Sequence, residues 1–101
     1  MWFHIATMRL HLPNADSIAE KLHSKDFGKL VKEYGGLQSY VLECPDHPTE
    51  FTFLTAWEEK EDAETFLSSK VYTDFIDEIE PLLVSPVCER RFEVMSEREK
   101  V

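Results

Sequence analysis

His4 is the side chain in this sequence with the clearest potential for chemistry. It is one of four histidines, and it stands in an alternating N-terminal stretch, on the side that also carries Ala6 and Met8. An imidazole exchanges protons near neutral pH, so His4 could accept a hydrogen bond from a phenol or take its proton. The alternative is a structural histidine at the end of a sheet, bonded to a backbone carbonyl.

Two other motifs have reactive residue types without the partners that chemistry needs. Cys44 and His47 are separated by two residues, a spacing that metal sites use, but a structural zinc ion needs four ligands and the sequence has no second pair of this kind. Ser68-Ser69 has no adjacent His or Asp, so we interpret it as a helix break and not as a nucleophile.

The first half of the chain predicts a strand, a helix and a second strand. Residues 2–12 alternate in the strand period until Pro13-Asn14. Asn14 or Asp16 can cap a helix whose apolar side chains recur at steps of three and four. This helix ends at Gly35-Gly36, which no Lys-Ser or Lys-Thr follows, so the glycines are a helix end and not a phosphate loop. Residues 37–43 form the next strand.

The second half predicts a hairpin, a broken helix and a last strand. A loop at residues 44–48 joins the second strand to a third at residues 50–57. The carboxylates between Glu58 and Glu64 suit a helix N-terminus, because the helix dipole favours negative charge there. The helical pattern resumes after Ser68-Ser69 and ends at Glu80-Pro81. Residues 87–95 form the fourth strand, and residues 96–101 are a charged tail.

This order predicts an α+β fold of the ferredoxin-like βαββαβ type, a four-stranded antiparallel sheet with the helices on one face, and residues 1–95 as a single domain. The third strand is apolar on both sides, with Phe53 and Trp57 on one and Leu54 on the other. Helices cover only one face, so we expect a homodimer joined through the open face. Arg9 and Arg91 are expected on that open face, in salt bridges across the interface.

Composition excludes several classes of function. The formal net charge is −9, and the basic residues are scattered, which argues against binding to nucleic acid or to an anionic membrane. The N-terminus lacks the features of a signal peptide, and no stretch is long and apolar enough for a transmembrane helix. We therefore expect a cytoplasmic protein whose two cysteines remain thiols.

The strand that ends in Trp57, the following EEKEDAETFLSSKVYTDF and the closing ERRFEVM resemble the antibiotic biosynthesis monooxygenase (ABM) family, a group of dimeric α/β barrels. The resemblance covers residues 2–95. Some members of this family oxygenate phenols or quinols without flavin or metal, and others degrade haem. It therefore implies a cofactor-independent monooxygenase for a small aromatic or quinol substrate, with no cofactor and no metal.

The resemblance also implies where such a site would lie. Haem-degrading members use an Asn, a Trp and a His at the positions of Met8, Phe66 and Ile76, and Ile76 cannot ligate iron. Other members carry a His shortly after the helix break, where this chain has Val71 and then Tyr72. His4 and Tyr72 are thus the expected proton-handling residues. The expected pocket walls are Met8, Phe53, Trp57, Phe66 and Phe75, although aromatic residues at such spacings are more often part of a plain core.

Two alternatives remain open at this point. The first is a non-catalytic module of the same fold that binds a small molecule or a partner, because every family residue that could be compared is replaced. The second is a haem-binding or haem-degrading protein. A packed core without a pocket would favour the first alternative over an enzyme.

Overall fold

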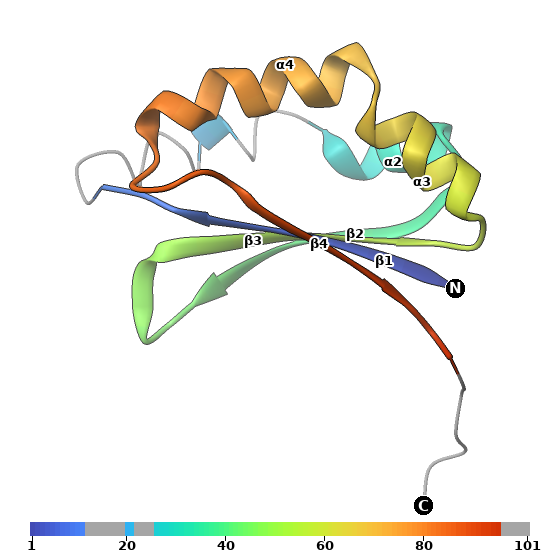
Figure 1. Cartoon of the computed structure of the whole chain (residues 1–101), viewed down its shortest axis with the longest axis horizontal. Coiled ribbons are helices and arrows are strands. Elements are labelled where there is room, and N and C mark those ends of the chain that lie inside the picture. The colour runs from blue at the N-terminus through green and yellow to red at the C-terminus, as the bar shows by residue number, and fades with distance from the viewer. Residues whose placement is uncertain (12–19, 22–25, 96–101) are drawn as a thin grey trace, which may run out of the picture.

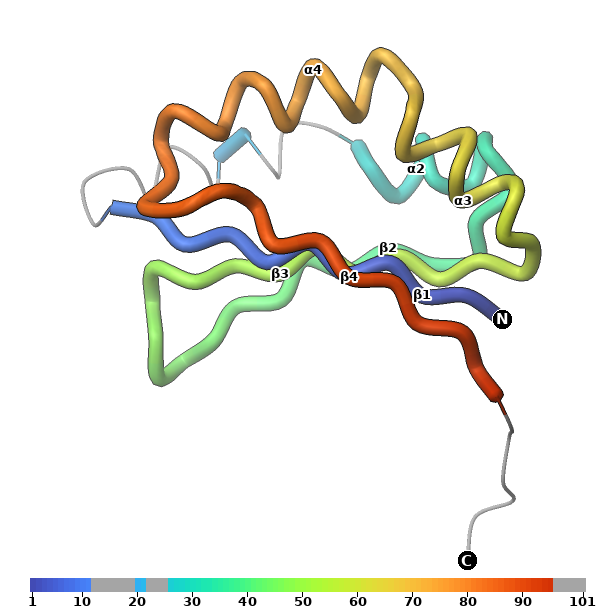
Figure 2. The backbone as a smooth tube through the Cα atoms, in the orientation of Figure 1, coloured from blue at the N-terminus to red at the C-terminus, as the bar shows by residue number. Residues whose placement is uncertain are grey.

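The computed structural model describes residues 1–11, 20–21 and 26–95. Its sheet has four antiparallel strands, β1 (Trp2–Arg9), β2 (Gly36–Cys44), β3 (His47–Trp57) and β4 (Cys88–Glu93), in the spatial order β2-β3-β1-β4. All labelled helices lie over one face of this sheet (Figure 1), and the backbone tube in Figure 2 leaves the other face uncovered. The ferredoxin-like fold predicted from the sequence is confirmed.

The central strand β1 sets the two faces of the sheet. Its alternate residues His4, Ala6 and Met8 are buried because they point toward the helices, as the sequence pattern predicts. Strand β3 pairs with β1 so that Phe53 lies opposite Ala6 and Phe51 opposite Met8, and residues directly opposite each other point to the same side. The core therefore lies between this face of the sheet and the helices.

Helix α2 (Phe27–Glu33) begins later than the sequence pattern suggests. The side chain of Asp26 accepts a hydrogen bond from the backbone N–H of Lys29 at 3.0 Å and caps the helix there, so one unbroken helix up to Gly35 is wrong. The predicted caps Asn14 and Asp16 lie outside the described residues. The predicted end is confirmed: Gly35 has a φ of +93°, a conformation that glycine adopts without strain.

The broken helix predicted around Ser68-Ser69 is confirmed as α3 (Lys60–Leu67) and α4 (Lys70–Ile79), followed by a 3₁₀ turn, η2 (Glu80–Leu82). Glu61 and Asp62 occupy the first turn of α3, where the helix dipole favours them. Ser69 then caps α4, since its side-chain oxygen accepts a hydrogen bond from the backbone N–H of Tyr72. The cap sets the position at which Tyr72 enters the core.

The β2–β3 hairpin is tighter than predicted. Both strands extend into the predicted loop of residues 44–48, so that only Pro45 and Asp46 form the turn and Cys44 pairs with His47. Strand β4 is shorter than predicted, since it ends at Glu93, and the predicted tail at 96–101 lies outside the described residues. Cys44 and Cys88 are both free thiols. In the described part of the chain, no helix is long and apolar enough to cross a membrane.

Candidate functional site

Burial of His4 is the unusual feature of this core. The side chain is only 2 % exposed, and neither ring nitrogen has a hydrogen-bond partner among the described residues. Its Nε2 atom lies 3.4 Å from Oε1 of Glu89, close enough for electrostatic attraction but not aligned as a hydrogen bond. A buried polar group without a partner costs about 1–3 kcal/mol. The backbone-bonded structural histidine considered above therefore does not describe His4.

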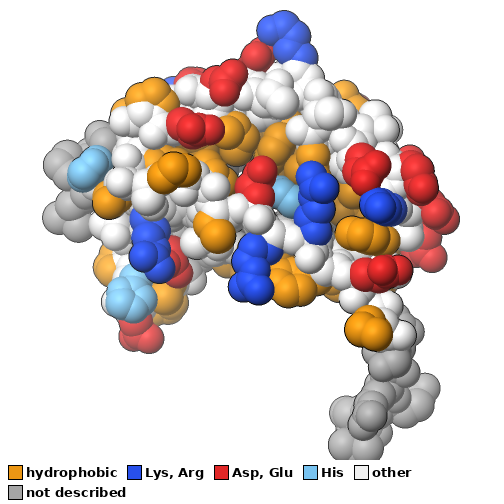
Figure 3. Space-filling model, viewed as in Figure 1, with side chains coloured by type: hydrophobic (Ala, Val, Ile, Leu, Met, Phe, Trp, Pro, Cys, Tyr) orange, Lys and Arg blue, Asp and Glu red, His pale blue; other side chains and the backbone are white. Residues whose placement is uncertain are grey.

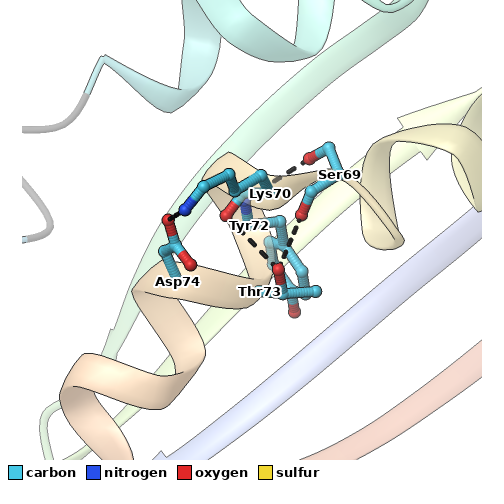
Figure 4. A network of polar contacts seen from close by, with 5 residues as sticks. All are labelled: Ser69, Lys70, Tyr72, Thr73 and Asp74. Atoms are coloured by element: carbon cyan, nitrogen blue, oxygen red, sulfur yellow. Dashed lines mark hydrogen bonds and ion pairs between the residues drawn. The ribbon is translucent and has the colours of Figure 1, made fainter.

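Tyr72 reaches the same carboxylate from the helix layer. Its hydroxyl donates a hydrogen bond of 2.6 Å to Oε1 of Glu89, and its ring meets that of His4 edge-on, with 6.0 Å between ring centroids. Figure 4 shows the first turn of α4, where Thr73 Oγ1 donates to the backbone carbonyl of Ser69 at 3.0 Å and Lys70 pairs with Asp74 at 2.8 Å. The Tyr72 ring points away from that ion pair, into the core.

The contacts among His4, Glu89 and Tyr72 shift two pKa values in opposite directions, that of the Glu89 carboxyl and that of the Tyr72 phenol. The His4 imidazole lowers the pKa of the Glu89 carboxyl, and the hydrogen bond from Tyr72 adds to this effect, while partial burial opposes both. Burial, followed by the hydrogen bond to Glu89, raises the pKa of the Tyr72 phenol well above its ordinary value. The lowered pKa keeps Glu89 an anion at neutral pH, and the raised pKa keeps Tyr72 protonated, so that its hydroxyl donates to Glu89.

Strand β4 places Arg91 beside this group, which corrects a prediction. Arg91 lies opposite His4 in the β1–β4 register, and Glu89 lies opposite Ala6, so both face the helix layer. The expectation that Arg91 lies on the open face is therefore wrong. Arg9 does lie on the open face, where its Nε donates to Oε1 of Glu50 at 3.2 Å and not to a residue of β4.

A crevice opens next to His4, between α3 and the strands β1 and β4. Apart from His4 itself, its apolar and charged walls come from Trp2, Phe3, Lys60, Ala63, Glu64, Leu67 and Arg91. The enclosed part has a volume of about 10 Å³, roughly the minimum for one water molecule. In Figure 3 an acidic, a histidine and a basic side chain lie side by side at the centre of the visible face, next to apolar side chains.

The other predicted pocket residues lie deeper and pack against one another. Met8, Phe53, Trp57, Phe66 and Phe75 are each at most 1 % exposed. The centroid of the Phe66 ring lies 5.5 Å from that of Trp57 and 5.3 Å from that of Tyr72. The Trp57 indole N–H donates a hydrogen bond of 2.8 Å to Thr55 Oγ1. These side chains form the core beneath the site, whereas His4 is the predicted site residue that lines the crevice.

Sequence reasoning missed Glu89 and Arg91 as site residues. All six residues of β4 are exposed, so no apolar alternation indicates which of them face the helices. A histidine on a buried strand face was a usable signal that a partner must exist, but its identity depends on the register of two strands that are far apart in sequence.

A metal site is not formed by the part of the chain that the structure describes. Those residues contain no group of three or more His, Cys, Asp or Glu side chains that could hold a metal ion. Ile76, at the position where haem-degrading relatives carry a ligand, packs against the apolar core.

Comparison with known proteins supports one family. The family model described as "Antibiotic biosynthesis monooxygenase" matches residues 1–78. A structure from Deinococcus radiodurans, provisionally described by the same name, is similar to this chain with a TM-score of 0.85 and 17 % sequence identity. The match covers 100 % of this chain and 99 % of that one. A structure from Nitrosomonas europaea, provisionally described in the same way, has a TM-score of 0.82 and 17 % sequence identity. That match covers 95 % of this chain and 100 % of the other.

A conserved protein from Methanosarcina mazei shares the fold as well, with a TM-score of 0.80 and 13 % identity over 90 % of this chain and 89 % of that one. At these identities the structures show the fold and not the reaction. No protein of curated function matches the chain at significant similarity.

Proposed function

Because the chain belongs to the antibiotic biosynthesis monooxygenase family, we propose that it oxygenates a small aromatic or quinol substrate bound beside His4. The substrate enters the crevice between α3 and β4, and His4 takes the proton of a substrate hydroxyl. Glu89 stabilises the protonated imidazole, and Tyr72 holds Glu89 in place. No cofactor is required by this proposal.

The chemistry follows from the electron-rich substrate itself. Once deprotonated, a phenol can donate electrons to O₂, and a carbon–oxygen bond forms at the ring carbon opposite the hydroxyl. With 1-naphthol as an example, one molecule of O₂ gives 1,4-naphthoquinone and one molecule of water, so the substrate supplies all the electrons. The protein needs to position the ring, exclude water and hold the proton.

The observation that carries this proposal is the buried His4 imidazole, whose nitrogens have no hydrogen-bond partner among the described residues and whose Nε2 lies 3.4 Å from the Glu89 carboxylate. Folding leaves an imidazole buried without a hydrogen bond only when surrounding interactions offset the cost. Glu89 lies beside Nε2 and favours a proton on that nitrogen, which leaves a lone pair on Nδ1. A lone pair on an imidazole that lines an apolar crevice can accept the proton of a substrate hydroxyl.

Oxygen uptake with 1-naphthol tests the proposal directly. We expect uptake by the wild-type protein, incorporation of one ¹⁸O atom from ¹⁸O₂ into the quinone, and a loss of about 100-fold in His4→Gln. His47→Gln is the matched control, because His47 is an exposed histidine at the β2–β3 hairpin. No uptake above that of heat-inactivated protein across a set of naphthols and hydroquinones would refute oxygenase activity, and full turnover by His4→Gln would exclude His4 as the base.

A non-catalytic binding or interaction module is the second candidate function. The small enclosed volume of the crevice favours it, because a substrate must displace side chains before it can bind. Saturable binding of naphthols without oxygen consumption would support this candidate, and turnover would exclude it.

We also propose that the protein is a homodimer joined through the open face of the sheet. Support comes from the apolar side chains there, since Tyr40, Leu42 and Phe92 are between 41 % and 48 % exposed. The β2–β3 and β1–β4 registers place all three on the face away from the helices. A second copy is the simplest cover for such a surface.

A further inference from the structure

We infer that the crevice beside His4 binds a small apolar ring that carries an anionic group, with Arg91 as the residue that pairs with the anion. This inference rests on the proposed function in that it names a substrate class for the same site. It concerns binding, however, and holds or fails separately from oxygen chemistry.

The inner part of the crevice suits the ring. Trp2, Ala63 and Leu67 contribute apolar surface from β1 and α3, and a planar molecule can stack or pack against such surface. The enclosed space is about 10 Å³, which is less than a ring needs. A ring therefore enters only when the long side chains at the mouth, Lys60 and Arg91, move aside, and a small ring system is the size that such a movement can admit.

The mouth of the crevice suits an anion. Arg91 lies opposite His4 across the β1–β4 pairing, and the Glu89 carboxylate beside it is engaged by Tyr72 and His4. The positive charge of Arg91 lowers the pKa of both Glu89 and Tyr72. The planar donors of a guanidinium match a carboxylate with two parallel hydrogen bonds.

Lys60 adds a second positive charge at the same mouth. Its Nζ lies 5.3 Å from the Trp2 ring centroid, and its ion pair with Glu64 is long, at 3.8 Å between half-exposed groups. Such a pair contributes little, so Lys60 can turn toward a bound anion. With a formal net charge of −9, the protein as a whole repels anions. At this mouth Lys60 and Arg91 offset the nearby carboxylates of Glu64 and Glu89, so the surface that an anion meets here is less negative than the rest.

His4 is the independent observation that the crevice is built for a ligand. It lines the crevice, is 2 % exposed and has no hydrogen-bond partner on either nitrogen among the described residues. A bound hydroxyl or amine on the ring would supply the missing partner. Arg91 and His4 are cross-strand neighbours, so one small molecule can contact both.

Paired probes that differ in charge test the inference. We expect 2-naphthoate to bind about tenfold more tightly than 2-acetylnaphthalene, its neutral counterpart, in an NMR titration that follows the Trp2 indole and the Leu67 methyl groups. Arg91→Gln should abolish this preference. Arg90→Gln is the matched control, because it removes the same charge from the opposite face of β4, where Arg90 lies over Phe92.

Three results would overturn the inference: equal affinity for the two probes, an equal loss of preference in both arginine variants, or binding that leaves the Trp2 and Leu67 signals unchanged. Failure of the oxygen-uptake assay together with selective naphthoate binding would refute the reaction alone. Oxygen uptake with neutral substrates and no preference for 2-naphthoate would refute the anion site alone.

Discussion

Tyr72 donates its hydroxyl hydrogen bond to Glu89 over 2.6 Å, and this contact ties the helix layer to the edge strand β4. β4 pairs with the sheet on one side only, and none of its six residues is buried. The Tyr72 contact therefore supports the strand that carries Glu89 and Arg91. It connects the stability of the fold to the geometry of the candidate site.

Tyr72→Phe should destabilise the protein by about 1 kcal/mol at pH 7, since a hydrogen bond to a charged group contributes roughly 1.5–3 kcal/mol and Glu89 is partly solvated. The raised pKa of Tyr72 predicts how this difference changes with pH. The folded state keeps the phenol protonated while the unfolded chain ionises it above about pH 10, so its contribution is complete below that pH and is lost as the pH rises further.

Urea unfolding of both proteins at pH 7, 9 and 10.5 measures this difference. It should be constant between pH 7 and 9 and smaller at pH 10.5, with protein concentration held fixed because of the proposed dimer. An unchanged difference at the highest pH would contradict the assignment of Tyr72 as a phenol that stays protonated in the folded state.

Ser69→Ala should cost about 1 kcal/mol, because it removes the N-cap of α4. The same substitution also deletes the hydrogen bond that Ser69 Oγ donates to the carbonyl of Phe66 at 2.6 Å. Ser68→Ala is the matched control: Ser68 Oγ donates to the exposed carbonyl of Glu64 at 2.8 Å, which water can satisfy, so we expect a change within about 0.5 kcal/mol. Equal losses in the two variants, measured by urea unfolding, would show that Ser69 has no special role as a cap.

The parts of this structure that the sequence predicts are those with a strong periodic signal. β1 is an inner strand with one face buried, so its alternation places His4, Ala6 and Met8 correctly toward the helices. The break at Ser68-Ser69 is similarly clear, because two small polar residues interrupt an apolar helical face.

The parts that the sequence does not predict depend on contacts between distant segments. Asp26 stands among residues at helical spacing, so its role as the cap of α2 was hidden by the apolar pattern around it. Glu89 and Arg91 lie on an edge strand with charges on both faces, and only pairing with β1 shows that they face His4. A site assembled between strands in this way is invisible to local periodicity.

Oligomeric state gives the last prediction, because the open sheet face requires a cover. Wild-type protein should elute with a light-scattering mass of twice the 11.8 kDa of the chain. Leu42→Lys and Phe92→Lys should each shift the equilibrium toward monomer, since a buried charge without a partner in an apolar interface is strongly unfavourable.

Leu37→Lys is the matched control for both substitutions. Leu37 is 41 % exposed, like Phe92, but it lies at the register shift of β2 and lines a groove with Gly28 and Lys32 of α2. The Leu37→Lys variant should therefore remain dimeric. A monomeric wild-type protein at micromolar concentration would refute the dimer, and equal dissociation of all three variants would place the interface elsewhere.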